Sequence, residues 1–129
     1  MSASLFGCNS QLDVAFLDEA YANDAETASY VFQMYLDELP SNLRMIQDSI
    51  TNNDIERFKQ LIHKQKPGYS YVGLTEVTAR LEELQKKCLN VNDLAIHEAE
   101  IDEVLKKIHA SVSVIEKALT HLKEAKRAW

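Results

Sequence analysis

The sequence predicts an all-α fold, an antiparallel up-down four-helix bundle with a short extra helix at its N-terminus. Three observations predict it. Apolar residues recur at steps of three and four through most of the 129 residues. Glycine and proline are rare, with three and two copies, which disfavours a turn-rich β fold. The segments between the apolar stripes are short, so consecutive helices are expected to run antiparallel.

Each expected helix is bounded by residues that commonly begin or end helices. Ser10 and Asp13 form an approximate capping box for the short first helix. Asp24 and Asp54 are suited to cap the second and third helices. Gly73 is suited to end the third. The expected helices span residues 11–21, 24–51, 54–72, 75–89 and 94–126.

Length and composition limit the class of protein. A chain of 129 residues fits one domain, here 1–129, with an irregular N-terminus over 1–10. The net charge of −6 disfavours a nucleic-acid partner, because phosphate binding needs a basic surface. No apolar run approaches the roughly 18 residues of a membrane span, and the first ten residues lack signal-peptide features. Cys8 and Cys88 lie far apart and are interpreted as reduced thiols of a cytoplasmic protein.

One stretch, LIHKQKPGYSYVGL over residues 61–74, is unusual for a helix in a bundle. At about 100° per residue, the apolar side chains of the third helix share one sector, which must face the core. They are Ile55, Phe58, Ile62, Tyr69 and Val72. His63 falls roughly 130° from the centre of that sector on ideal geometry. It is therefore expected to face solvent, with Lys59, Lys66, Pro67 and Ser70 near it.

The charge pattern around His63 favours a nucleophilic role. Residues 57–75 hold four bases and no acid; the bases are Arg57, Lys59, Lys64 and Lys66. Neighbouring cations favour a neutral imidazole, which is a nucleophile, and would stabilise an anion attached to it. Pro67 and Gly68 add no long side chain beside it. A kinked helix with a solvent-exposed histidine and a solvated basic patch explains this pattern equally well.

The segment HKQKPGYSYVGL resembles the signature of histidine phosphotransfer (HPt) domains. That signature places a lysine three residues after the histidine, a small residue at the fourth place and a glycine at the tenth. Here these places hold Lys66, Pro67 and Gly73 after His63. The upstream FQMYLDELPSNLRMIQDSITNNDIERFKQLIH and the downstream LTEVTARLEELQKKC also resemble the family, so the likeness covers about residues 12–90.

Two positions depart from the family pattern. The fourth place is usually glycine, and here Pro67 stands there with Gly68 following. The second place is usually apolar and faces the core, and here it is Gln65, whose direction the sequence leaves open. Neither change removes the histidine or the lysine, although an altered partner preference stays open.

The resemblance implies a phosphorelay intermediate without catalytic activity of its own. One receiver domain's aspartyl phosphate would donate to His63 at Nε2, and a second receiver would take the group away. Lys66 and Lys64 would be charge partners of the phosphate, and Gln85 on the next helix is a weaker candidate for hydrogen bonding. The receiver, from a response regulator or hybrid kinase, would bring Mg²⁺, so no cofactor is expected here. We expect a monomer, because the patch has to stay open to partners.

The sequence leaves one other function open and disfavours two. A non-transferring adaptor that docks a signalling partner through the surface around His63 remains the main alternative. A metal or haem bundle is disfavoured, because His97, His109 and His121 recur every twelve residues, about 120° apart on a helix. A self-sufficient enzyme is disfavoured by the lack of a glycine-rich phosphate loop and of a nucleophile–base pair at helical spacing.

Overall fold

The computed structural model describes residues 5–7 and 11–127. Those residues form helices and connections and contain no strand, so the predicted all-α class is confirmed. The long helices are α2 (Ala25–Thr51), α3 (Ile55–Tyr71), α4 (Thr75–Lys87) and α5 (Glu98–Arg127). The shorter ones are α1 (Val14–Tyr21) and two 3-10 helices, η1 (Cys88–Asn90) and η2 (Leu94–His97).

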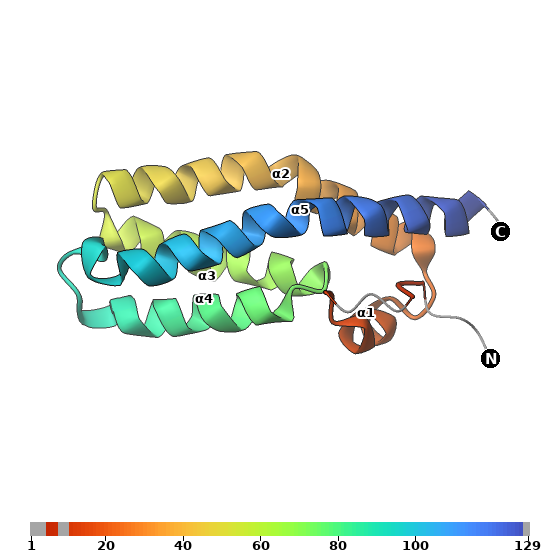
Figure 1. Ribbon diagram of the computed structural model, residues 1–129, viewed down its shortest axis with the longest axis horizontal. Helices are drawn as coiled ribbons and strands as arrows, with labels where there is room; N and C mark the ends of the chain where they lie inside the picture. Colours follow the sequence, from red (N-terminus) through yellow and green to blue (C-terminus); the bar gives the residue numbers. More distant parts are fainter. Residues whose placement is uncertain (1–4, 8–10, 128–129) are drawn as a thin grey trace.

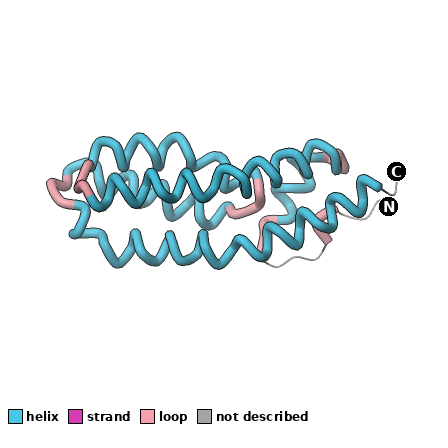
Figure 2. Tube along the Cα trace, turned by 90° about the horizontal axis from the view of Figure 1, so that it is seen from above, coloured by secondary structure: helices cyan, strands magenta, loops and turns pink. Residues whose placement is uncertain are grey.

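The four long helices form a closed ring of neighbours in which α2 packs on α3 and α5, and α4 packs on the same two. They run in alternating directions along the long axis, and α1 lies at one end (Figure 1). Connections gather at the other end (Figure 2). There the Asn53 side chain accepts from the Leu94 amide at 2.9 Å and donates to the Asn92 carbonyl at 3.4 Å. This links the α2–α3 turn to the α4–α5 connection.

Aspartate side chains cap the first turns of α2 and α3. The Asp24 carboxylate accepts from the Thr27 amide at 3.0 Å, and Asp54 accepts from Arg57 at 3.1 Å, which confirms the expected caps of α2 and α3. These bonds satisfy amide groups that have no partner within the helix.

Three expected boundaries are wrong. Helix α1 begins at Val14 and not at residue 11, because the Asp13 carboxylate itself caps it through the Phe16 amide at 3.1 Å. Ser10, the expected partner in that cap, lies outside the described residues. Helix α4 ends at Lys87 and not at residue 89. Helix α5 begins at Glu98 and not at residue 94, because η1 and η2 form the connection between the two helices. Part of this connection packs inward, since Cys88 and Leu94 are both buried.

The core lies along the axis of the bundle. Its most deeply buried side chains come from α2, α3 and α5, and Leu81 and Leu84 of α4 and Leu17 of α1 are buried with them. These most deeply buried side chains are Phe32, Ile46, Phe58, Ile62, Ile108, Ile115 and Leu122. Cys88 is a buried free thiol, and burial raises its pKa. Cys8 lies outside the described residues. Among the described residues no helix is long and apolar enough to cross a membrane.

Gly73 fixes the turn between α3 and α4. Its φ of +84° is costly for residues with a side chain. A Cβ there would lie 2.7 Å from the Leu17 Cδ1 atom of α1. The Gly73 carbonyl accepts from the Asp13 amide at 2.8 Å, and the Tyr21 hydroxyl donates to the Tyr71 carbonyl at 2.6 Å. The expected helix end is confirmed, and it is also where α1 attaches to the bundle.

Candidate functional site

His63 lies on the outer side of α3, and its side chain is exposed. The opposite side of the same helix is anchored by Phe58, Leu61 and Ile62, all nearly inaccessible to water. Because this apolar face sets the rotation of α3, the imidazole is directed outward. The exposure expected from the helical spacing is confirmed.

Lys66 lies one turn after His63 on the same side of the helix. Its Nζ atom donates to Oε1 of Gln85 on α4 at 3.3 Å, and Oε1 of Glu82 lies 3.6 Å away. The Lys66 side chain is only 18% exposed, so its stem is packed between α3 and α4. The structure brings Gln85 to Lys66, whereas the role expected for Gln85, hydrogen bonding near the imidazole, stays a prediction. It adds Glu82, which the sequence analysis did not single out.

A hydroxyl pair fixes α3 against α4 below Lys66. The Thr78 hydroxyl lies 2.7 Å from that of Ser70 and donates to the Lys66 carbonyl at 3.3 Å. Ser70 was expected on the outer side with His63; it is half-buried, because its hydroxyl is bonded to α4. These contacts hold the backbone of Lys66 in place relative to α4.

Lys64 is directed to the other flank of α3. It is exposed and lines a groove between α2 and α3, and among the described residues it forms no ion pair. Lys64 and Lys66 therefore lie on opposite sides of the ridge that carries His63. The first leaves its charge uncompensated, and the second is engaged by α4.

The expected positive island is partly neutralised, which corrects the interpretation of the charge pattern. Lys59 pairs with Glu56 at 2.8 Å, and Lys66 lies near Glu82. Both carboxylates lie outside the acid-free segment 57–75. Glu56 immediately precedes that segment, and Glu82 belongs to the neighbouring helix α4. Counting charges along the chain could not show the second contact.

Pro67 and Gly68 leave the surface next to His63 uncluttered. Pro67 lies inside α3 and is exposed; it has no N–H to bond the His63 carbonyl one turn earlier. No atom beyond its own helix and chain neighbours lies within 4 Å of where a Cβ at Gly68 would stand. A partner's backbone can therefore approach the histidine closely.

Gln65, left open by the sequence, turns toward α2. Its Nε2 donates to the Asn42 carbonyl at 3.3 Å, while its Oε1 is buried with no hydrogen-bond partner among the described residues. Gln65 and Lys64 belong to a groove of about 670 Å³ between α2 and α3. Its walls combine apolar and aromatic side chains with polar and charged ones. The first group includes Val31, Met34, Tyr35, Leu39, Leu61, Tyr69 and Tyr71, and the second includes Glu38, Asn42, Arg57 and Gln60.

Two tyrosines form the floor of this groove. The rings of Tyr35 and Tyr69 meet edge to face with their centroids 5.8 Å apart. The Tyr69 hydroxyl has no hydrogen-bond partner among the described residues, whereas the Tyr35 hydroxyl is buried near Ser111. Burial raises the pKa of Tyr69 to about 12. Burial, and to a smaller extent the neighbouring Tyr69, raise the pKa of Tyr35, and Ser111 opposes this rise. The floor is thus apolar in character although it carries phenol groups.

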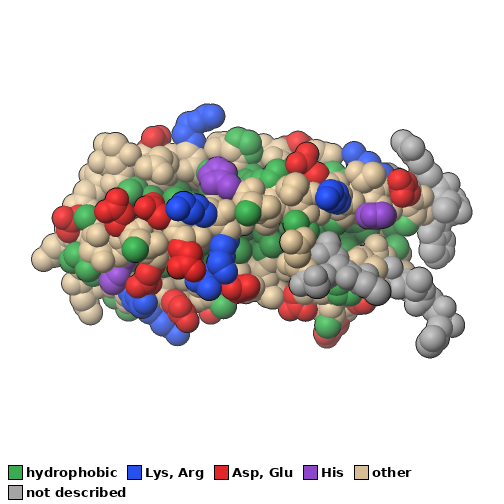
Figure 3. All heavy atoms as spheres, in the orientation of Figure 1, with side chains coloured by type: hydrophobic (Ala, Val, Ile, Leu, Met, Phe, Trp, Pro, Cys, Tyr) green, Lys and Arg blue, Asp and Glu red, His purple; other side chains and the backbone are tan. Residues whose placement is uncertain are grey.

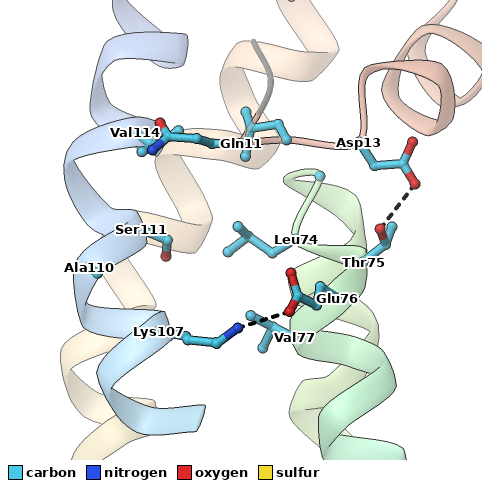
Figure 4. Close-up of a pocket in the computed structure, with 12 residues that line it drawn as sticks. Gln11, Asp13, Leu74, Thr75, Glu76, Val77, Lys107, Ala110, Ser111 and Val114 are labelled. Carbon is cyan, nitrogen blue, oxygen red and sulfur yellow. Dashed lines mark hydrogen bonds and ion pairs between the residues drawn. The ribbon is translucent and has the colours of Figure 1, made fainter. Parts of the chain in front are cut away.

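A second hollow lies away from His63, between the start of α4, α5 and the segment before α1 (Figure 4). Its volume is about 490 Å³. Its polar side chains already have partners: Glu76 pairs with Lys107 at 2.9 Å, and the Thr75 hydroxyl donates to Asp13 at 3.0 Å. Of the expected site residues only Gly73 lines it, so the chemistry around His63 has its own surface.

The other histidines do not assemble a site. His97 lies in η2 and not in α5, and His109 is exposed on α5. His121 lies 3.8 Å from Glu124. Among the described residues no group of three His, Cys, Asp or Glu side chains is placed to hold a metal ion.

The surface where α4 and α5 meet is charged differently from that around His63. Three ion pairs cross it: Arg80–Glu103 at 2.8 Å, Lys87–Glu100 at 2.7 Å and Lys107–Glu76 at 2.9 Å. In Figure 3 basic and acidic side chains accordingly lie next to one another on the visible face. The charged side chains named here are therefore already paired with one another.

The described residues form a helical bundle with an exposed histidine, backed by a packed apolar face and followed one turn later by a lysine held against α4. The chain belongs to a known family of helical bundles: the family model described as the Hpt domain matches residues 31–125. Members of this family act in histidine phosphotransfer with the receiver domains of two-component phosphorelays. The match includes every predicted site residue and leaves α1 outside. No curated protein and no solved structure gives a significant match.

Proposed function

We propose that this chain is a phosphorelay intermediate in which His63 carries the phosphoryl group. The supporting observation is that His63 is exposed on a rigidly backed helix, with Lys66 held one turn away. In the reaction the Nε2 lone pair attacks the phosphorus of a receiver's aspartyl phosphate. The N–P bond forms, the P–O bond breaks with its electron pair leaving on the aspartate carboxylate, and Nδ1 keeps its proton. Transfer to a second receiver reverses these steps.

Positioning and charge do the work of this chain in that reaction. Lys66, held by Gln85, supplies a cation close to the group on His63, and Lys64 supplies a second cation from the other flank. Gln85 acts through Lys66 and positions it. The Mg²⁺ that phosphoryl transfer from an aspartate requires belongs to the receiver, and this chain needs no cofactor of its own.

The groove between α2 and α3 is our candidate docking surface for the receiver. It combines apolar walls with two partly exposed large side chains, Met34 and Tyr71, beside the uncompensated Lys64. A receiver has an acidic phosphorylation pocket, so a cation beside an apolar groove is complementary to it. We propose that the chain acts as a monomer in the cytoplasm, where its partners reside.

The test is transfer of label from a panel of phosphorylated receivers to the purified chain. The wild type should gain acid-labile, base-stable label, and His63→Gln should gain none. His109→Gln is the matched control, because His109 is also exposed on a long helix but far along the chain from Lys66. It should be labelled like the wild type.

Two outcomes would overturn the assignment. Label that survives in His63→Gln would place the phosphoryl group elsewhere. Receiver binding without any label on the wild type would mean that the chain is a docking adaptor and not a carrier.

A further inference from the structure

We propose that Glu82 on α4 weakens the hold of Lys66 on a phosphoryl group at His63 and so favours passing that group to the receiver. This rests on the proposed carrier function of His63. It assigns Glu82 a positioning role, because the carboxylate acts through Lys66 and does not touch the reacting atoms.

The geometry places one ammonium between two oxygens of α4. Lys66 Nζ lies 3.3 Å from Oε1 of Gln85 and 3.6 Å from Oε1 of Glu82. The Lys66 stem is packed, whereas the Glu82 side chain is 52% exposed. Lys66 is therefore confined near its position, and Glu82 is free to move away from it. The three residues also line one shallow hollow with Lys86 and Leu89.

A phosphoryl group on His63 changes the balance among these charges. Such a group carries about −1.5 to −2 charge at pH 7, and it competes with Glu82 for the same ammonium. Gln85 is neutral and orients Lys66 without this competition. Lys66 therefore stabilises the phosphoryl group on His63 less than it would without Glu82.

The experiment measures where the phosphoryl group resides at equilibrium between the chain and one receiver of known concentration. Glu82→Gln keeps the shape and removes the charge. It should raise the ratio of phosphorylated chain to phosphorylated receiver roughly two- to five-fold, the range expected for one partly exposed charge. The gain should shrink at high salt, because exposed charges are screened.

Glu83→Gln is the matched control. It removes the same charge from the neighbouring position of α4, but Glu83 has no contact with Lys66 among the described residues. Its equilibrium ratio should stay at the wild-type value. An equal rise in both variants would mean that net charge alone is responsible, and the proposal would be wrong.

A double variant tests the route through Lys66. In a Lys66→Ala background, Glu82→Gln should change the ratio much less than it does in the wild type. An undiminished rise there would overturn the role assigned to Glu82. Failure of the carrier function has a different signature, because the wild type would then take no label from any receiver.

Discussion

The two flanks of α3 are built differently, although one helix presents both. The flank toward α4 is closed by polar contacts, in which Thr78 bonds Ser70 and the Lys66 carbonyl and Gln85 holds the ammonium. The flank toward α2 is a groove of about 670 Å³ that leaves Lys64 without an ion-pair partner among the described residues. His63 lies on the ridge between them.

This difference matches two tasks of the phosphoryl carrier that we propose. A group that stabilises a transferred phosphoryl must be held in place before the reaction, and the closed flank holds Lys66. A surface that receives several partners must leave apolar and charged groups uncovered, and the open flank does so. Changes on the closed flank should therefore cost stability, and changes on the open flank should cost little or none.

The largest expected contrast uses one substitution at the two glycines of this region. Gly73→Ala should lower the free energy of unfolding by about 2–3 kcal/mol, because φ is +84° there and the new Cβ would meet Leu17 at 2.7 Å. Gly68→Ala, inside α3 with open space around the new Cβ, should raise it by about 0.5–1 kcal/mol. Urea denaturation of both variants measures the difference.

A loss at both glycines would contradict this contrast, because it would mean that the groove side of α3 is also tightly packed. A circular dichroism spectrum of each variant in the absence of urea checks that both retain the helical fold before the free energies are compared.

The sequence predicted those parts of this site that depend on one helix alone. The buried face of α3 and the exposure of His63 follow from the spacing of apolar residues, which any packed amphipathic helix must obey. The caps at Asp24 and Asp54 were predictable because each hydrogen bond joins two residues only three positions apart in the same helix. Gln85 came from the family resemblance, and the structure places it against Lys66.

The parts that depend on how two helices face each other were not predictable. Glu82 reaches Lys66 only because of how α4 is rotated and shifted relative to α3. Core packing between the two helices determines that rotation and shift. The inward turn of Gln65 toward Asn42 depends likewise on the distance between α2 and α3. Periodicity of a single helix holds no information on either quantity.

The second prediction concerns alkaline pH and the floor of the groove. The pKa of Tyr69 is raised from about 10 to about 12, so the unfolded chain ionises first. The neutral Tyr69 phenol makes its full contribution to the free energy of unfolding below pH 10. That contribution decreases by about 1.4 kcal/mol per pH unit as the pH rises toward 12. In urea denaturations between pH 8 and pH 11, Tyr69→Phe should make the free energy of unfolding decrease less steeply with pH than in the wild type.

Tyr30→Phe is the control for that experiment, since Tyr30 is 67% exposed and packs on neither flank. Its slope should match the wild type. Near pH 7 Tyr69→Phe should be as stable as the wild type or slightly more so, because the hydroxyl it removes has no partner among the described residues. A clear loss at pH 7 would show that this hydroxyl is satisfied and that the floor is not apolar.

The smallest expected effect compares one polar group from each flank. Thr78→Val removes the hydroxyl that bonds both Ser70 and the Lys66 carbonyl and should cost about 1–1.5 kcal/mol. Gln65→Met removes an amide whose oxygen is buried without a partner among the described residues and whose nitrogen donates to the Asn42 carbonyl at 3.3 Å. The lost bond and the relieved oxygen offset each other, so the expected change is within about 0.5 kcal/mol of zero. Thr78→Ser, which keeps the hydroxyl, should restore most of the loss in urea denaturation; equal losses for Thr78→Val and Gln65→Met would mean that the two flanks of α3 do not differ in how they are held.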